Sequence, residues 1–187
     1  MKWIGQHIWD FISRFRNDVY LENLSTSLQK DILMADSNGK IYKSNGNRKF
    51  TKTADGTHFE AQGDILYLGT GSTTQGDLCY LKEDGSWGQA DADGAATGDD
   101  ADRDAIGMLA IALGTDPDAD GMLIRGIITM DYDLGDCGNP VYISTTAGAM
   151  SNSVPGSGDF VRIVGYCLDD THGQIWFNPD SAWVEIA

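Results

Sequence analysis

The chain is poor in positive charge. Its 187 residues include 13 Lys and Arg against 28 Asp and Glu, a formal net charge of −15. This balance argues against a nucleic-acid-binding protein and against insertion into or docking on an anionic membrane, because both kinds of binding need a basic patch. Hydrophobic residues still make up 41% of the chain, so it can form a core and is not a disordered acidic tail.

Long apolar runs and cysteine pairs are also lacking. The longest apolar run, residues 106–113, is far below the roughly 18 residues of a membrane-spanning helix. Polar residues interrupt the N-terminal region where an export signal needs an apolar stretch, so we expect no Sec export. Cys79, Cys137 and Cys167 have no CxxC spacing, which favours free thiols, buried where the runs are apolar, over a disulfide or a metal site.

Proline is scarce but glycine is plentiful. The 23 glycines and only four prolines indicate that glycine makes many of the turns, since the usual glycine share is only about 7%. Short strands joined by glycine turns are typical of β proteins. We therefore predict a mainly β fold.

Apolar residues recur at helical spacing in residues 1–20, and polar or charged residues lie on the other faces of the helix that this spacing predicts. They predict an N-terminal amphipathic helix with more apolar surface than a lone helix tolerates in water. It either docks on its own domain or serves as an anchoring and oligomerisation helix. Its expected assembly interface consists of Trp3, Ile4, Ile8, Phe11, Ile12 and Phe15.

Residues 21–62 consist of short apolar pieces separated by turn signals. Asn38-Gly39, Asn45-Gly46 and Asp55-Gly56 are dipeptides that suit tight hairpins. Strands this short bury little surface alone. The segment is interpreted as a turn-rich stalk or meander that neighbouring chains complete.

Residues 63–187 contain a repeated pattern, G-[DN]-x-x-Y-[LI]. After the second and third copies the chain turns at a glycine and returns as an apolar strand, at 107–113 and at 161–168. This organisation predicts a C-terminal β-barrel or sandwich with an internal strand-loop-strand duplication. The three copies lie at residues 63–68, 76–81 and 138–143.

The sequence contains few patterns typical of a catalytic site. His7, His58 and His172 stand apart, without the spacing of a metal site, and no nucleophile elbow or phosphate-loop lysine accompanies them. The sequence therefore predicts a protein that is not an enzyme and has no cofactor other than a possible calcium ion.

The calcium candidate is the run Asp116, Asp118 and Asp120 followed by Gly121. Alternating carboxylates before a glycine match the first half of a calcium loop, but its twelfth position is Ile127, where such a loop needs a bidentate Glu on a helix. Residues 122–129 also suggest a strand. The alternative is an ordinary Asp-rich turn.

A second acidic stretch, Ala90 to Asp104, is expected to be a solvated, mobile loop that faces outward together with residues 116–121. Flat Trp faces beside Asp and Asn side chains could instead form a sugar-binding platform. Of the candidates Trp87, Trp176 and Trp183, Trp87 follows a turn and is expected to be the most exposed.

Several runs resemble a β-rich module found at the C-terminus of structural proteins of marine tailed phages, in tail-fibre-like and head-decoration-like contexts. The opening IGQHIWDFISRFRNDVYLENL is similar to the start of such proteins, and the resemblance covers most of the chain. The runs are GDILYLGTGS, GMLAIALGTDP, GMLIRGIITMD, PVYISTTAGAM, PGSGDFVRIVGYCLD and IWFNPDSAWVEI.

The resemblance implies a homotrimeric virion surface protein that is assembled in the cytoplasm of a bacterial host, and it brings no catalytic residues. A fibre or appendage subunit is favoured, because helix, stalk and β domain follow one another along the chain. The alternatives are a capsid decoration protein that cements the head and a glycan- or receptor-binding adhesion module. Expected partners are other copies of the chain, other virion proteins contacting the N-terminal helix, and a host-surface glycan or receptor.

Overall fold

Strands dominate the part of the chain that can be described. The computed structural model describes residues 59–96, 98–169 and 171–187. Their helices are short, α1 (Arg103–Ile106) and a 3-10 turn (Gly98–Asp100). The strands are β1 (Ala61–Leu66), β2 (Leu78–Leu81), β3 (Trp87–Gln89), β4 (Leu109–Ala112), β5 (Met122–Thr129), β6 (Pro140–Ile143), β7 (Met150–Ser151), β8 (Phe160–Val161), β9 (Ile163–Cys167), β10 (Gln174–Phe177) and β11 (Val184–Glu185).

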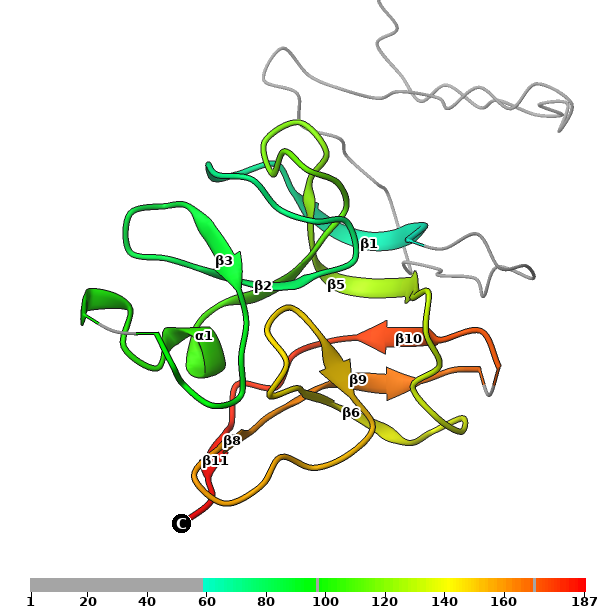
Figure 1. Ribbon diagram of the computed structural model, residues 1–187. Coiled ribbons are helices and arrows are strands. Elements are labelled where there is room, and N and C mark those ends of the chain that lie inside the picture. Colours follow the sequence, from blue (N-terminus) through cyan, green and yellow to red (C-terminus); the bar gives the residue numbers. More distant parts are fainter. Residues whose placement is uncertain (1–58, 97, 170) are drawn as a thin grey trace, which may run out of the picture. The chain divides into compact units, whose positions relative to one another are not determined.

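The mainly β fold predicted from composition is confirmed. Nine strands form one sheet in the order β3-β2-β4-β5-β10-β9-β6-β7, with β1 also paired to β5, and β8 and β11 form a separate pair. The large sheet curls into a half-barrel (Figure 1). The sequence predicted a β-barrel or a sandwich for this part of the chain. The helix expected over residues 1–20 and nearly all of the expected stalk lie outside the described residues.

The same pairing pattern occurs in both halves of the sheet. β2 pairs with β3 and β4, and β4 pairs with β5; likewise β6 pairs with β7 and β9, and β9 pairs with β10. β5 and β10 join the halves. The first copy of the sequence pattern starts no third unit, because residues 61–66 form β1 and pair along β5.

Alternation along the strands sends side chains to two faces. On β2, Leu78 and Tyr80 join the main core with Ile111 and Leu123. Cys79 points to the opposite, outer face, where a smaller cluster also contains Trp87, Ala110, Ala112 and Met122. The main core contains aliphatic and aromatic side chains from both halves of the sheet, such as Val164, Ile175 and Phe177.

β1 and β5 approach each other most closely at a pair of glycines. Gly63 and Gly126 are partners in the antiparallel register. A Cβ added at Gly63 would overlap the carbonyl oxygen of Arg125, and one added at Gly126 would overlap that of Gln62. Gly126 also has φ of +156°. Glycine is thus required on both strands for this pairing.

Residues 90–92 connect the two halves at the ends of the sheet. Gly148 N–H donates to the Ala90 carbonyl at 2.8 Å, and Ala92 N–H donates to the Ser144 carbonyl at 2.8 Å. The Ala92 carbonyl in turn accepts from Phe160 N–H at 2.7 Å. Ala90 and Ala92 are fully buried. The expectation that residues 90–104 form a solvated, mobile loop is therefore wrong at this end, because the backbone pairs with the second half.

Candidate functional site

Aspartates in this domain serve mainly as hydrogen-bond acceptors for the backbone of loops. In seven cases the carboxylate accepts the N–H of the residue two positions further on, the bond that defines an Asx-turn. Such bonds fix the shape of a loop without help from a ligand. The seven are Asp84, Asp91, Asp93, Asp116, Asp133, Asp169 and Asp180.

The calcium candidate follows this pattern. Asp116 Oδ1 accepts from Asp118 N–H at 3.1 Å, and Asp120 Oδ2 accepts from Asp116 N–H at 3.0 Å. Two of the three carboxylates are thus turned toward their own backbone, the geometry of an Asp-rich turn. Within the described ranges, no group of three or more His, Cys, Asp or Glu is arranged to hold a metal ion. Ile127 lies in β5, so the strand expected at 122–129 is confirmed.

Asp104, at the end of the second acidic stretch, is buried rather than solvated. It is only 4% exposed, and its carboxylate accepts from Ala96 N–H at 2.8 Å and from Ala105 N–H at 3.1 Å. Burial raises the pKa of Asp104, although these backbone bonds oppose the shift. Burial likewise raises the pKa of Asp91 nearby. The stretch is therefore part of the packed domain at both ends.

These shifts predict a pH-dependent effect of Asp104→Asn. In the folded state the carboxyl has a pKa above the 3.8 of an unperturbed aspartate, so folding favours its protonated form, and the stability that this gives is lost as pH rises through the folded pKa. Asparagine keeps one of the two acceptor bonds but carries no charge. We therefore expect the difference in free energy of unfolding, variant minus native chain, to become more favourable to the variant as the pH rises from about 4 to about 7.

Urea unfolding at both pH values measures this difference. Asp136→Asn serves as the control, because it makes the same change of charge at an exposed position. A difference between Asp104→Asn and the native chain that stays constant with pH would contradict the prediction.

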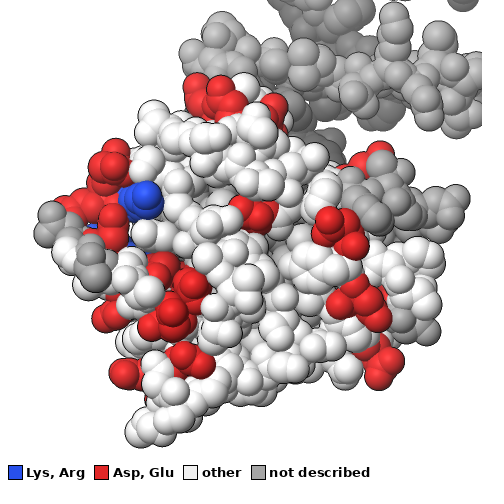
Figure 2. Space-filling view, viewed as in Figure 1, with Lys and Arg blue, Asp and Glu red and all other residues white. Residues whose placement is uncertain are grey.

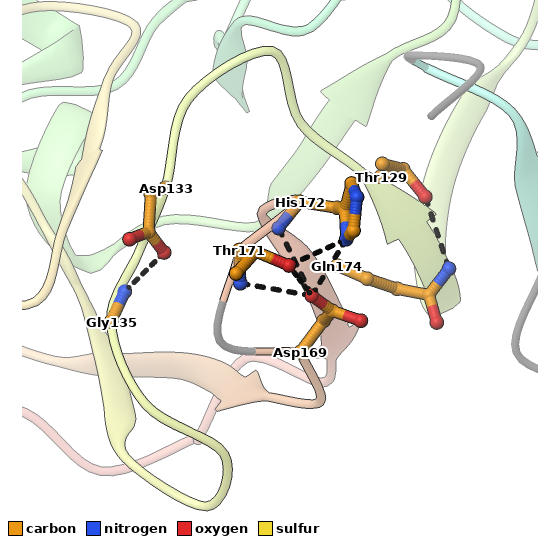
Figure 3. A network of polar contacts seen from close by, with 7 residues as sticks. All are labelled: Thr129, Asp133, Gly135, Asp169, Thr171, His172 and Gln174. Atoms are coloured by element: carbon orange, nitrogen blue, oxygen red, sulfur yellow. Dashed lines mark hydrogen bonds and ion pairs between the residues drawn. The ribbon is translucent and has the colours of Figure 1, made fainter. Parts of the chain in front are cut away.

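Asp169 organises the turn between β9 and β10 (Figure 3). Its Oδ1 accepts from the backbone N–H of Thr171 at 2.9 Å and of His172 at 3.0 Å, and lies 3.0 Å from His172 Nδ1. His172 is 55% exposed whereas Asp169 is buried. Since one oxygen makes all these contacts, the carboxylate–imidazole pair caps the turn. In the same view Gln174 Nε2 donates to Thr129 Oγ1 at 3.1 Å, joining β10 to β5.

Arg162 is the buried cation of the described domain, 7% exposed. Its Nε donates to the Asp180 carbonyl at 2.8 Å, and its Nη1 donates to the Gly107 carbonyl at 2.6 Å and lies 3.4 Å from the Ala105 carbonyl. Burial lowers the pKa of the guanidinium, and the charge of Asp180 partly offsets this. The side chain links the segment after α1 to the C-terminal segment through backbone oxygens.

A polar hollow lies on the outer face beside the β2–β3 hairpin. It has a volume of about 370 Å³, and Asp77 Oδ2 accepts from Gln89 Nε2 at 2.7 Å in its wall. A second hollow of about 190 Å³ lies beside β6 and β7. We call the first one the hairpin pocket. It is lined by Ser72, Thr73, Thr74, Asp77, Cys79, Lys82, Trp87, Gly88 and Gln89.

The tryptophans are arranged differently from the expectation. Trp87 is only 3% exposed. The backbone at Leu68 and Gly69 lies against its ring, and Trp87 Nε1 donates to the Leu68 carbonyl at 2.8 Å. Trp183 is 43% exposed and packs edge-on against Phe160. Trp176 lies under the guanidinium of Arg125. The expectation that Trp87 is the most exposed of the three is therefore wrong, and its face is not open to a sugar.

The cysteines agree with the expectation of free thiols. Cys79 and Cys167 are buried in β2 and β9, and Cys137 is exposed. Burial raises the pKa of Cys79 to about 12, so this thiol is neutral and unreactive at physiological pH.

The expected assembly interface, from Trp3 to Phe15, lies outside the described residues. None of the helices described is long and apolar enough to cross a membrane. No protein-family model, curated protein or solved structure matches the chain.

Sequence reasoning missed the hairpin pocket and the three buried charged residues, Asp104, Arg162 and Asp169. The pocket combines three separate segments, and no local spacing signals their meeting. Arg162 did carry a weak signal, since it interrupts the otherwise apolar run 160–164. A charge in such a run is either exposed at an edge or buried with partners.

Proposed function

We propose that the chain is a structural protein of a tailed-phage virion, a homotrimeric fibre or appendage subunit that presents its β domain outward. The observation that carries this proposal is the use of the carboxylates. Eleven aspartates accept backbone N–H bonds in loops and turns. Such loops keep one shape without a ligand, which suits a protein that displays a surface.

The distribution of charge supports an outward β domain. Residues 59–187 contain 22 Asp and Glu but only four Lys and Arg, whereas residues 1–58 contain six acidic and nine basic residues. Carboxylates are scattered over the face shown in Figure 2, with few basic side chains among them. Like charge keeps crowded copies of such a domain hydrated and apart, and the less acidic N-terminal residues are the better candidates for contact with the particle.

In this proposal each part of the chain has a task. Residues 1–20 form the anchoring helix, residues 21–62 the stalk, and residues 63–187 a β domain derived from an internal duplication. The repeated pairing pattern of the two halves supports the duplication. The protein is assembled in the bacterial cytoplasm and contacts other virion proteins through the helix.

The proposed trimer predicts a large effect from charges on the apolar face of residues 4–15. We expect the double substitution Ile8→Asp and Ile12→Asp to convert a trimer into a monomer, because burying two carboxylates in an apolar interface is prohibitive. Light scattering measures the mass. Gln6→Asp with Ser13→Asp adds the same charge on other faces and should leave the trimer intact.

Circular dichroism should show the same β signal in all three proteins. A native chain that is monomeric at micromolar concentration would contradict the proposal, and so would dissociation of both double variants alike. Locating the protein in a reconstruction of the intact particle distinguishes the alternatives, since density at the head would identify a decoration protein instead of a fibre.

A further inference from the structure

The hairpin pocket gathers hydrogen-bonding groups from one face of the β2–β3 hairpin. The register pairs Cys79 with Gln89 and Leu81 with Trp87, so these side chains share the outer face with Asp77, two positions before Cys79. The bond from Gln89 Nε2 to Asp77 Oδ2 holds the amide and the carboxylate in place. It uses one amide hydrogen and one lone pair, so both groups have further bonding capacity.

The backbone of β3 contributes a second set of groups. Ala90 N–H donates to the Leu78 carbonyl, and in an antiparallel ladder the neighbouring residue then directs its N–H and C=O away from the partner strand. The N–H and C=O of Gln89 therefore point to the free edge of the hairpin. Trp87 N–H uses that same edge to donate to the Thr70 carbonyl at 3.1 Å.

The opposite wall is held in a fixed position. Thr73 Oγ1 donates to the Gly114 carbonyl at 2.8 Å, and Thr73 N–H donates to the Thr115 carbonyl at 3.1 Å. Ser72 and Thr74 on either side are exposed lining residues. Their hydroxyl groups can both donate and accept hydrogen bonds.

The contents of the pocket indicate its ligand. A carboxylate, a primary amide and hydroxyl groups on rigid walls are suited to a molecule with several hydroxyl groups, and a volume of about 370 Å³ lies near the lower end of small-molecule sites, roughly 300–1,000 Å³. The lining carries one carboxylate, Asp77, and one ammonium, Lys82, in a chain with a net charge of −15, and this balance favours a neutral ligand over an anionic one. The neutral thiol of Cys79 at the base offers no nucleophile.

We propose that the hairpin pocket binds one neutral pyranose unit of a glycan, with Asp77 and Gln89 as the residues that recognise its hydroxyl groups. This inference goes beyond the virion assignment and does not depend on it. Failure of sugar binding would leave the assembly proposal unchanged.

The test uses the full-length chain with three neutral probes and one acidic probe. Saturation-transfer NMR is recorded with methyl glycosides of glucose, mannose and galactose, and with N-acetylneuraminic acid. We expect transfer to at least one neutral glycoside, with the acidic sugar at least about tenfold weaker. Asp77→Asn should weaken binding about tenfold or more, since it replaces one of the two acceptor oxygens by an NH2 donor. Asp136→Asn, with the same change of charge outside the pocket, should bind like the native chain.

A second variant keeps the test decisive if Asp77→Asn disturbs the hairpin. Ser72→Phe adds a bulky side chain at an exposed position of the wall and should abolish binding by filling the pocket, with an unchanged circular dichroism spectrum. Binding to none of the neutral glycosides would overturn the proposal. Equal binding by the native chain and folded Ser72→Phe would also overturn it, because the sugar would then lie elsewhere.

Discussion

Replacing Arg162 with methionine is expected to lower the free energy of unfolding by about 3 kcal/mol or more. Methionine fills much of the same space but has no donors. The carbonyls of Gly107 and Asp180 would then be left without the bonds that Arg162 makes to them at 2.6 Å and 2.8 Å. Urea unfolding measures the loss.

The position of Arg162 also predicts which segments lose protection in Arg162→Met. Hydrogen exchange should increase around residues 105–107 and 180–185, the segments that the guanidinium links. Arg103→Met removes a charge from the partly exposed helix α1 and should change stability by less than about 0.5 kcal/mol. A loss for Arg162→Met no larger than for Arg103→Met would show that the buried guanidinium contributes no net stability.

Gly126→Ala is expected to reduce stability by about 2–3 kcal/mol and to release β1 from the sheet. The added Cβ would overlap the Gln62 carbonyl oxygen in the neighbouring strand, and β1 can relieve the overlap only by moving away from β5. Hydrogen exchange at residues 61–66 should then rise before the rest of the sheet is affected.

Gly85→Ala is the matched control for that substitution. Gly85 has φ of +81° but nothing within 4 Å of an added Cβ, so only the backbone preference is lost, about 1 kcal/mol. If the two alanine variants are equally stable and β1 stays protected, close packing of β1 on β5 is not what requires glycine at position 126.

The sequence was informative wherever local pattern decides structure. The apolar runs predicted the strands that became β4, β5, β9 and β10, and residues 122–129 were predicted to the residue. The repeated turn and return signals predicted two similar units because each unit pairs with sequence neighbours. The sequence predicted a β-barrel or sandwich but not the half-barrel form of the sheet, since the curvature of a sheet depends on how distant strands meet.

The site could not be read from the sequence for a related reason. Trp87 follows a turn in the sequence, which suggests exposure. The segment around Leu68, nearly 20 positions earlier, covers its ring, and Trp87 Nε1 donates to the Leu68 carbonyl. Asp104 ends an acidic stretch of the sequence that suggests exposure, and only tertiary contacts bury it. Composition reports average tendencies, whereas burial of a single charge depends on which segments reach it.

The arrangement of the sheet has a consequence for synthesis and folding. Each half is built from pairs close in sequence, but the seam between the halves joins β5 to β10, with Gln174 and Thr129 45 positions apart. Contacts between distant segments form late, because loop closure must precede them. As the chain leaves the ribosome, the first half can pair before β10 is made. Until β10 arrives, half of one edge of β5 stays open to pairing with other chains, so nascent or truncated forms ending before residue 174 are expected to aggregate through that edge.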